Sequence, residues 1–379
     1  MSASPALHAP LPYDETCEDV APDEVEVIAA INEELLKIAR VVCNDTGHAM
    51  RAVHAKGHGL LRGRMTVEPG LTPPLAQGIF REPRSYPVLL RLSTSAGDVL
   101  PDSVSLPRGL ALKVYDVPGE RLEGSEGETT QDFLFVDAPA FVAPDARHFL
   151  KSLRLLAHTT DKAAGLKKVL SAALRGAEQA AEALGHESAT LRSLGGHPLT
   201  HILGETYHTQ VPLLHGRYMA KLSLVPGSDE LRALQGTTLG LAGQPDGLRD
   251  AIRQFFRAHG GEWLLRAQLC TDLQRMPIED ASVAWSEAES PHRPVARIVC
   301  PPQDTWDDAL GHDQEDRLYF SPWRGVAEHR PLGSVMRARR YAYRVSAGFR
   351  RDRNAPPPEP ETARTHVPPV PRDAPPWTT

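Results

Sequence analysis

The segment Arg51–Gly59 combines residue types that can move protons. Its histidine, His54, follows an arginine by three positions and precedes two glycines, Gly57 and Gly59, that end any regular helix. From Leu60 onward the residues alternate as in a strand. A histidine at such a coil-to-strand junction can aim a ring nitrogen into a cavity, which suits general acid or base chemistry. As one of sixteen histidines, His54 could equally be an ordinary packed residue.

A second group of reactive side chains lies near the C-terminus, on one face of an expected helix. Arg339 and Tyr343 are four residues apart, and Arg350 lies two turns beyond Tyr343. Because a tyrosine phenol has a pKa of about 10, it ionises at neutral pH only beside a cation or a metal. Arg337 and Tyr341 share the first spacing, but only Tyr343 is followed by an arginine at the interval of Arg350.

These two segments, with three motifs between them, resemble the haem catalase superfamily. Arg51–Gly59 is similar to the catalase distal-histidine segment, and the face of Arg339, Tyr343 and Arg350 is similar to its proximal helix. The other motifs follow in the family's order, as Arg91–Gly97, Arg108–Tyr115 and Phe133–Phe141. The small catalase-related proteins, which include allene-oxide-synthase-like proteins, are especially similar in three further motifs, Gln131–Phe133, Pro277–Ser282 and His329–Ser334.

The resemblance implies a cofactor, haem b with its iron, and a role for each matching residue. Tyr343 would ligate the iron, as tyrosine does in catalases, with Arg339 orienting the phenolate. His54 would transfer protons, backed by Ser93. The other cofactor-binding residues that the resemblance implies are propionate-binding arginines and apolar pocket residues, namely Arg51, Arg91, Arg350, Val53, Phe133 and Phe141.

One departure concerns the distal asparagine that positions peroxide in efficient catalases. None of the chain's asparagines falls in the corresponding stretch; they are Asn32, Asn44 and Asn354. Counting without gaps places Glu128 there, and a short gap would bring in Thr129 or Gln131. We therefore take Thr129 and Gln131 as candidate catalytic residues. Without the amide we expect weak catalase activity and stronger peroxidase activity with organic donors.

Composition restricts the class of protein. The 379 residues are 41% hydrophobic and 24% charged, as in a globular protein with ample core. A net charge of −6 argues against nucleic acid as a partner. The four cysteines lie far apart, which suggests neither a disulfide framework nor a zinc ribbon. No run reaches the length of about 18 apolar residues expected of a membrane span, and the N-terminus does not resemble a secretory signal. We therefore expect a cytoplasmic protein.

The elements expected around these residues fit an α+β fold, a catalase-like antiparallel eight-stranded β-barrel with flanking and inserted helices. Residues 1–22 are expected to form an N-terminal arm, and residues 23–353 a single haem domain. Within that domain, a helical insertion at about 145–200 separates two strand groups, 59–137 and 217–300. The proximal helix should span about 334–351, with Ser334 as its N-cap. The proline-rich residues 354–379 are expected to be a disordered tail.

The sequence thus predicts a haem oxidoreductase that consumes hydrogen peroxide or an organic hydroperoxide, with an organic electron donor as a further partner. A homo-oligomer is left open. One alternative is a haem enzyme that rearranges or cleaves fatty-acid-type hydroperoxides. An alternative of another class is a haem-binding sensor without turnover.

Overall fold

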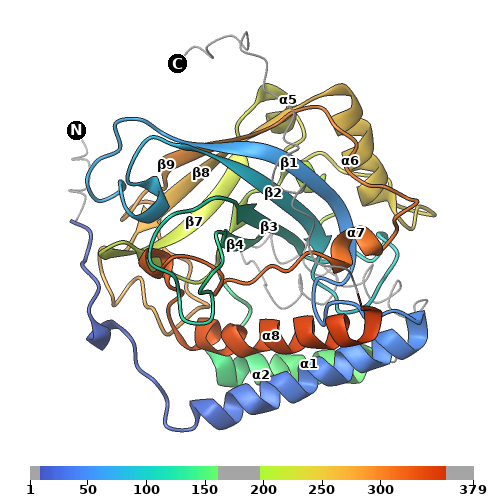
Figure 1. The fold of residues 1–379 in the computed structure, drawn as a ribbon, viewed down its shortest axis with the longest axis horizontal. Helices are drawn as coiled ribbons and strands as arrows, with labels where there is room; N and C mark the ends of the chain where they lie inside the picture. The colour runs from blue at the N-terminus through green and yellow to red at the C-terminus, as the bar shows by residue number, and fades with distance from the viewer. Residues whose placement is uncertain (1–8, 161–196, 356–379) are drawn as a thin grey trace, which may run out of the picture.

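An antiparallel β-barrel forms the centre of the computed structural model, which describes residues 9–160 and 197–355 (Figure 1). Its strands pair in the order β5-β4-β3-β2-β1-β9-β8-β7-β6, and β5 also pairs with β7. That last pairing closes eight strands into a ring and leaves β6 beside β7. The eight-stranded antiparallel barrel expected from the sequence is therefore confirmed. The strands are β1 Gly57–Val67, β2 Ser85–Thr94, β3 Arg108–Val114, β4 Gln131–Val136, β5 Tyr207–His208, β6 Leu213–His215, β7 Tyr218–Pro226, β8 Gly261–Leu269 and β9 Arg293–Cys300.

Alternate residues of the strands belong to two different apolar clusters. One fills the barrel interior and includes Leu90 of β2, Leu112 of β3 and the fully buried Trp263 of β8. Leu89, one position from Leu90, packs outside the barrel with Phe320 and others. This two-residue period means that one strand can stabilise the core with one face and build a site with the other.

Helices cover the outside of the barrel. Three of them, α1, α2 and α8, lie side by side in one layer below it (Figure 1). Their shared apolar cluster includes Ile31 and Ile38 of α1, Leu153 of α2 and Ala338 of α8. The described α-helices are α1 Glu24–Thr46, α2 Ala146–Thr160, α5 Asp229–Arg232, α6 Gly247–Ala258, α7 Asp313–Asp316 and α8 Ser334–Asn354.

The C-cap of helix α1 turns the chain toward the barrel. Gly47 adopts the left-handed conformation, with φ of 72°, and its N–H bonds to the Cys43 carbonyl. The chain then continues through residues 48–56 and enters β1 at Gly57. The segment that carries His54 is therefore the connection between the helical layer and the barrel.

Helix α8 begins at Ser334, as predicted, but its N-cap and its C-terminal end differ from the prediction. Gly333, with φ of 84°, is the N-cap, so the expectation that Ser334 caps the helix is wrong. The Ser334 hydroxyl instead accepts a hydrogen bond from the Ala146 N–H at 3.4 Å. At the other end the helix continues to Asn354, whose amide bonds to the Ala49 carbonyl at 2.9 Å. Asn354 is thus part of the folded domain, and the rest of the expected tail, 356–379, lies outside the described residues.

Other predicted segments are described only in part. Of the arm, residues 9–22 contact the barrel: the Leu11 N–H bonds to the Cys270 carbonyl, and Tyr13 packs in the same apolar cluster as Cys270. Of the helical insertion, α2 is described, whereas 161–196 lie outside the described residues.

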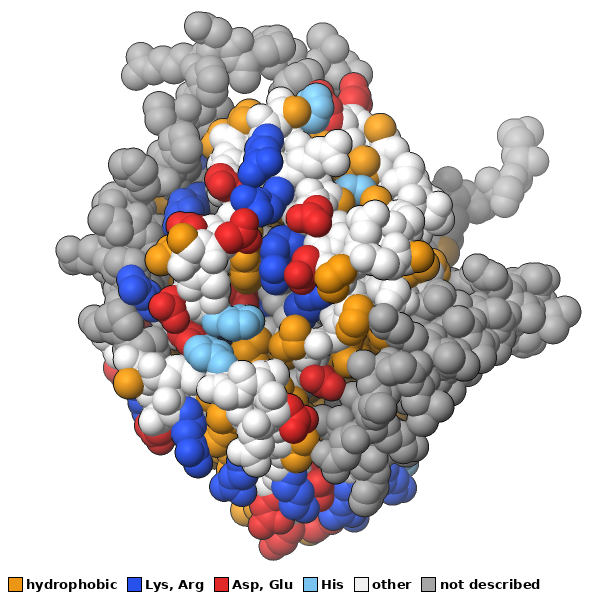
Figure 2. All heavy atoms as spheres, turned by 90° about the vertical axis from the view of Figure 1, so that its right-hand side faces the viewer, with side chains coloured by type: hydrophobic (Ala, Val, Ile, Leu, Met, Phe, Trp, Pro, Cys, Tyr) orange, Lys and Arg blue, Asp and Glu red, His pale blue; other side chains and the backbone are white. Residues whose placement is uncertain are grey.

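No described helix is long and apolar enough to cross a membrane. On the face shown in Figure 2, basic and acidic side chains alternate over short distances. On this face there is accordingly no large field of one sign that would attract a polyanion.

Candidate haem-binding site

A cavity lies between the outer face of the barrel and the helical layer. It is lined by the outward residues of β2, β3 and β4, by the segment around His54, by residues 319–320 and by one face of α8. About 760 Å³ is free of protein atoms, some of it open to solvent.

Strand register builds the barrel wall of the cavity. Ser93 of β2 pairs with Gly109 of β3, which pairs with Val136 of β4. The next row is Arg91, Ala111 and Leu134. All six residues line the cavity. In both rows the residue of β3 is small, Gly109 or Ala111, so the side chains of this strand take up little of the cavity.

His54 sits at the edge of this wall in an uncommon backbone conformation, with φ of 54°. Its Nδ1 lies 3.1 Å from the Ser93 hydroxyl, which in turn donates to the Gly109 carbonyl at 3.4 Å. A Cβ added at Gly109 would come within 2.5 Å of the imidazole, so only glycine leaves room for the ring here. When the Ser93 proton is donated to the carbonyl, the hydroxyl accepts from Nδ1–H, and in this tautomer Nε2 is the free base.

Burial and nearby cations keep this imidazole neutral. Burial lowers the pKa of His54 to about 3, and the charges of Arg91 and Arg339 act in the same direction. A neutral imidazole can accept a proton at any pH well above that value, so His54 is suited to act as a base first.

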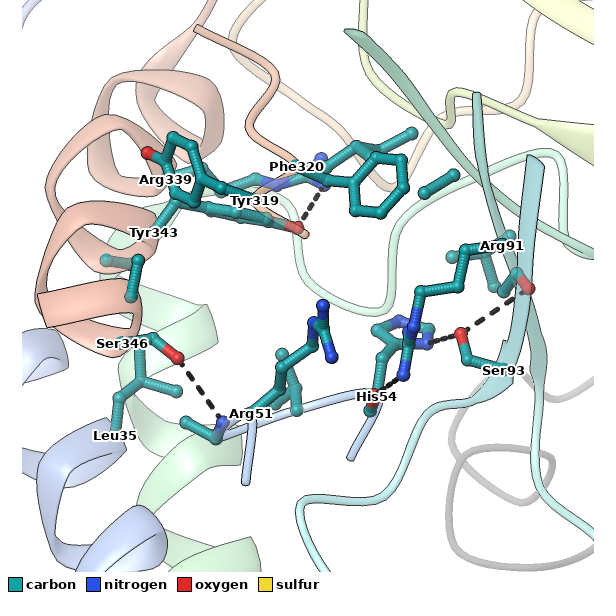
Figure 3. Close-up of a pocket in the computed structure, with 18 of the residues that line it drawn as sticks. Leu35, Arg51, His54, Arg91, Ser93, Tyr319, Phe320, Arg339, Tyr343 and Ser346 are labelled. Atoms are coloured by element: carbon teal, nitrogen blue, oxygen red, sulfur yellow. Dashed lines mark hydrogen bonds between the residues drawn. The ribbon is translucent and has the colours of Figure 1, made fainter. Parts of the chain in front are cut away.

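Tyr343 faces the cavity from α8, on the side opposite the barrel wall (Figure 3). Arg339 donates a hydrogen bond to its phenol oxygen at 3.0 Å. Such a donor stabilises a phenolate over a phenol. The rival tyrosine of the same helix, Tyr341, is 44% exposed and is not among the described residues that line the cavity.

Three arginines, Arg51, Arg91 and Arg350, line the cavity together. Burial, with the like charges of Arg91 and Arg350, lowers the pKa of Arg51 well below its ordinary value. Arg350 keeps Nε and Nη1 buried without a hydrogen-bond partner; its nearest carboxylate, on Asp316, is 3.9 Å from Nη1. A buried group of like charges with unused donors is a site for anions.

A carboxylate that the sequence did not reveal already meets this cluster. Glu315 of α7, 4% exposed, accepts a hydrogen bond from Arg91 Nε and lies 4.0 Å from Arg51 Nη1. Although burial opposes its charge, Arg91 and Arg51 hold the pKa of Glu315 below its ordinary value. The Gly57 backbone packs against this carboxylate, and any side chain there would collide with it.

The residues present fit haem. A phenol and an imidazole lie on opposite sides of a largely apolar cavity, and the arginine cluster with unused donors suits carboxylates such as propionates. Eight of the sequence candidates line this one cavity; they are Arg51, Val53, His54, Arg91, Ser93, Arg339, Tyr343 and Arg350.

Four other candidates do not line the cavity. Gln131 and Phe133 point into the barrel, where the Gln131 side chain accepts from the Val326 N–H at 2.9 Å and Phe133 joins the interior cluster. Thr129 is exposed beyond the start of β4. Phe141 packs beside Phe149, with ring centroids 5.1 Å apart. Among the described residues, no asparagine or glutamine lines the cavity.

Sequence reasoning missed several lining residues. Leu134, Val136, Gly109 and Ala111 could be found only from strand register, and Tyr319 belongs to a loop without a motif. On α8 a signal did exist. Ala342, Ser346 and Ala347 share the helix face of Tyr343, and small residues there leave space for a cofactor.

Comparison with known proteins shows which solved structures share this architecture. No family model and no curated protein sequence matches the chain. Among solved structures, catalase A from Saccharomyces cerevisiae is similar with a TM-score of 0.59 and 16% identity, over 96% of this chain and 71% of that one. A fungal catalase has a TM-score of 0.58 and 15% identity, over 96% of this chain and 70% of that one. A bacterial catalase has a TM-score of 0.55 and 16% identity, over 94% of this chain and 67% of that one. The chain therefore has the catalase fold.

Proposed function

We propose that this protein binds haem b through Tyr343 and consumes hydroperoxides with His54 as the proton-transfer group. The observation that carries the proposal is that these two side chains face one cavity, beside three buried arginines. The catalase fold, which the first three structural neighbours share, supports it. The sequence resemblance to the small catalase-related proteins supports an assignment to that group.

The geometry of the chain's own residues indicates how protons move. Neutral His54 takes a proton at Nε2 from a hydroperoxide in the cavity and returns it to the departing oxygen, while Ser93 holds the ring through Nδ1. Arg339 donates a hydrogen bond to the Tyr343 oxygen and would orient it toward the iron. Bound haem would supply the iron that takes up the oxidising equivalents of the peroxide. Arg51, Arg91 and Arg350 are the residues that would hold its propionates.

The cavity also bears on which reaction dominates. Holding a molecule as small as hydrogen peroxide needs a positioned polar group, and misplacement by about 1 Å can cost about 100-fold in rate. With no amide among the described lining residues, peroxidase activity with organic donors should exceed disproportionation of hydrogen peroxide. A cytoplasmic location stays part of the proposal, since all four cysteines are free thiols.

Haem binding is tested by reconstituting the purified protein and recording its Soret spectrum. Tyr343→Phe should lose the cofactor or shift the band to that of a weaker ligand. Tyr341→Phe is the matched control, since it removes the same hydroxyl from the exposed face of α8, and it should bind as the wild type does. Equal spectra for both variants would remove Tyr343 as the ligand.

Activity is then measured with the haem-loaded protein. Oxygen evolution from hydrogen peroxide, oxidation of an organic donor and consumption of a lipid hydroperoxide separate catalase, peroxidase and hydroperoxide-rearranging enzymes. Donor oxidation should be the fastest of the three. A Soret band that does not respond to any peroxide would identify a haem sensor instead.

A further inference from the structure

A second group of metal-binding side chains lies apart from the residues that line the cavity. Asp137 directly follows β4, and His197 and Glu205 flank the short helical turn Ile202–Gly204. One ligand atom of each of the three side chains lies within 4.8 Å of the others. The Asp137 and His197 side chains are only 1% and 5% exposed. Two carboxylates and an imidazole are thus gathered in a largely enclosed place.

Each of the three groups is oriented by a partner on its far side. His197 Nδ1 lies 2.7 Å from the Pro198 carbonyl, which can only accept, so Nδ1 carries a proton. Asp137 Oδ1 accepts the Arg108 N–H at 2.9 Å. Glu205 Oε1 accepts from the Thr200 hydroxyl. Outer contacts of this kind, above all a histidine N–H on a backbone carbonyl, are what hold metal ligands in place.

The facing atoms of Asp137 and His197 are not satisfied by a neutral imidazole alone. Asp137 Oδ2 is buried and accepts no hydrogen bond, although His197 Nε2 is 2.7 Å away. With Nδ1 protonated, His197 either turns a lone pair of Nε2 toward the carboxylate, and the two lone pairs repel, or it carries a second proton on Nε2 and donates it to Asp137. Either a proton on Nε2 or a metal ion beside the two atoms removes this repulsion, and the second carboxylate, Glu205, favours a doubly charged ion.

We propose that Asp137, His197 and Glu205 bind a divalent transition-metal ion of the zinc or manganese class. One imidazole and two carboxylates suit these ions, with a water in the open position, whereas calcium and magnesium prefer oxygen ligands alone. The nearby guanidinium of Arg108 is directed to the Leu106 carbonyl at 2.6 Å and to Ser105 Oγ at 3.3 Å. It offsets one of the two carboxylate charges, so a net negative charge remains for the cation.

The site joins the end of β4 to the segment that leads into β5. Asp137 adjoins Val136, which lines the cavity, and His197 and Glu205 belong to the segment that leads into β5. A bound ion would fix that segment to the end of β4. It would thereby stabilise the cavity wall, without contacting the cavity's own ligands.

Zinc and manganese titrations of the haem-free, chelator-treated full chain test the proposal by calorimetry. The wild type should bind one equivalent and melt at a higher temperature with the ion present. His197→Ala and Glu205→Gln should each lose at least tenfold in affinity and the thermal shift. His148→Ala is the control, since His148 also pairs with an aspartate, Asp145, but on the exposed surface, and it should behave as the wild type does.

Two outcomes would overturn the site. One is a folded wild-type protein, judged by near-UV circular dichroism, that binds neither ion; His197 would then be a charged partner of Asp137. The other is binding that survives both substitutions. Because the titration uses haem-free protein, neither result depends on whether Tyr343 binds haem.

Discussion

At the scale of single residues, His54 is the side chain whose chemistry the structure specifies most fully. Its left-handed backbone, its Ser93 contact and the space at Gly109 fix the ring, and the hydrogen bonds accommodate the tautomer with a free Nε2. A strained conformation held by several contacts is common where a side chain has a reactive role.

His54→Ala should therefore bind haem normally but react with peroxide about 10²–10⁴-fold more slowly, which is the usual contribution of a general acid or base. Stopped-flow mixing of the haem-loaded protein with hydrogen peroxide measures this rate. A loss of less than tenfold would exclude His54 from proton transfer.

The pH dependence of the same rate follows from the pKa of His54, about 3. The base is active when neutral, so its contribution should stay constant from pH 8 to pH 5 and fall only as the pH approaches that value. An exposed histidine would instead lose activity near its ordinary pKa of about 6.5. A rate that halves near pH 6.5 would therefore contradict the burial assigned to this ring.

At the scale of elements, the middle strand β3 controls the space beside His54. Gly109→Ala would place a Cβ within 2.5 Å of the imidazole and 2.9 Å of Ser93 Oγ. Since both atoms belong to the proposed proton-transfer pair, the ring must move, and the peroxide rate should fall at least tenfold. Gly348→Ala on α8 is the matched control, because nothing lies within 4 Å of its added methyl. It should leave the rate unchanged and slightly stabilise the helix.

The short helix α7 supplies Glu315, the carboxylate that pairs with the buried Arg91 and Arg51. Glu315→Gln removes the carboxylate that meets Arg91 and Arg51, and breaking a buried pair costs about 3–5 kcal/mol because it leaves the partner charge uncompensated. If propionates also meet these arginines, the loss should be smaller in the haem-loaded protein. Urea denaturation of both forms measures the difference, with the exposed Asp313→Asn as control. Equal losses would place the propionates elsewhere.

The elements also explain what the sequence could and could not predict. The sequence could place His54 and Tyr343 among the candidates that line the cavity because each lies in a local motif with a chemical requirement. Phe133 was misplaced because β4 is apolar on both faces, so composition cannot tell which face points outward; the structure turns Phe133 inward and Leu134 to the cavity. Glu315 was missed because it meets the arginines only through tertiary contacts, and α7 is too short to give a periodic pattern.

At the scale of the whole molecule, the barrel buries many histidines in the neutral form. Burial lowers the pKa of His201, His208 and His215 to about 4, and that of His292 and His329 to about 3. In the unfolded chain each returns to about 6.5, so the unfolded state binds more protons below that pH. Stability should therefore fall as the pH drops below about 6.5, by up to about 1.4 kcal/mol per pH unit for each histidine.

His329 allows this expectation to be tested at one ring. Its Nε2 accepts the Ile79 N–H at 3.1 Å and its Nδ1 lies 3.1 Å from the Leu214 carbonyl, so protonation at Nε2 would cost the first bond. His329→Gln should lower the free energy of unfolding at pH 7 but make its decline from pH 6 to pH 4.5 shallower by about 1.4 kcal/mol per pH unit. Phe80→Leu, which removes a ring packed edge-on against His329, should lower stability without changing that slope. Urea titrations across this pH range measure both, and an unchanged slope in His329→Gln would mean that this ring is already protonated in the folded protein.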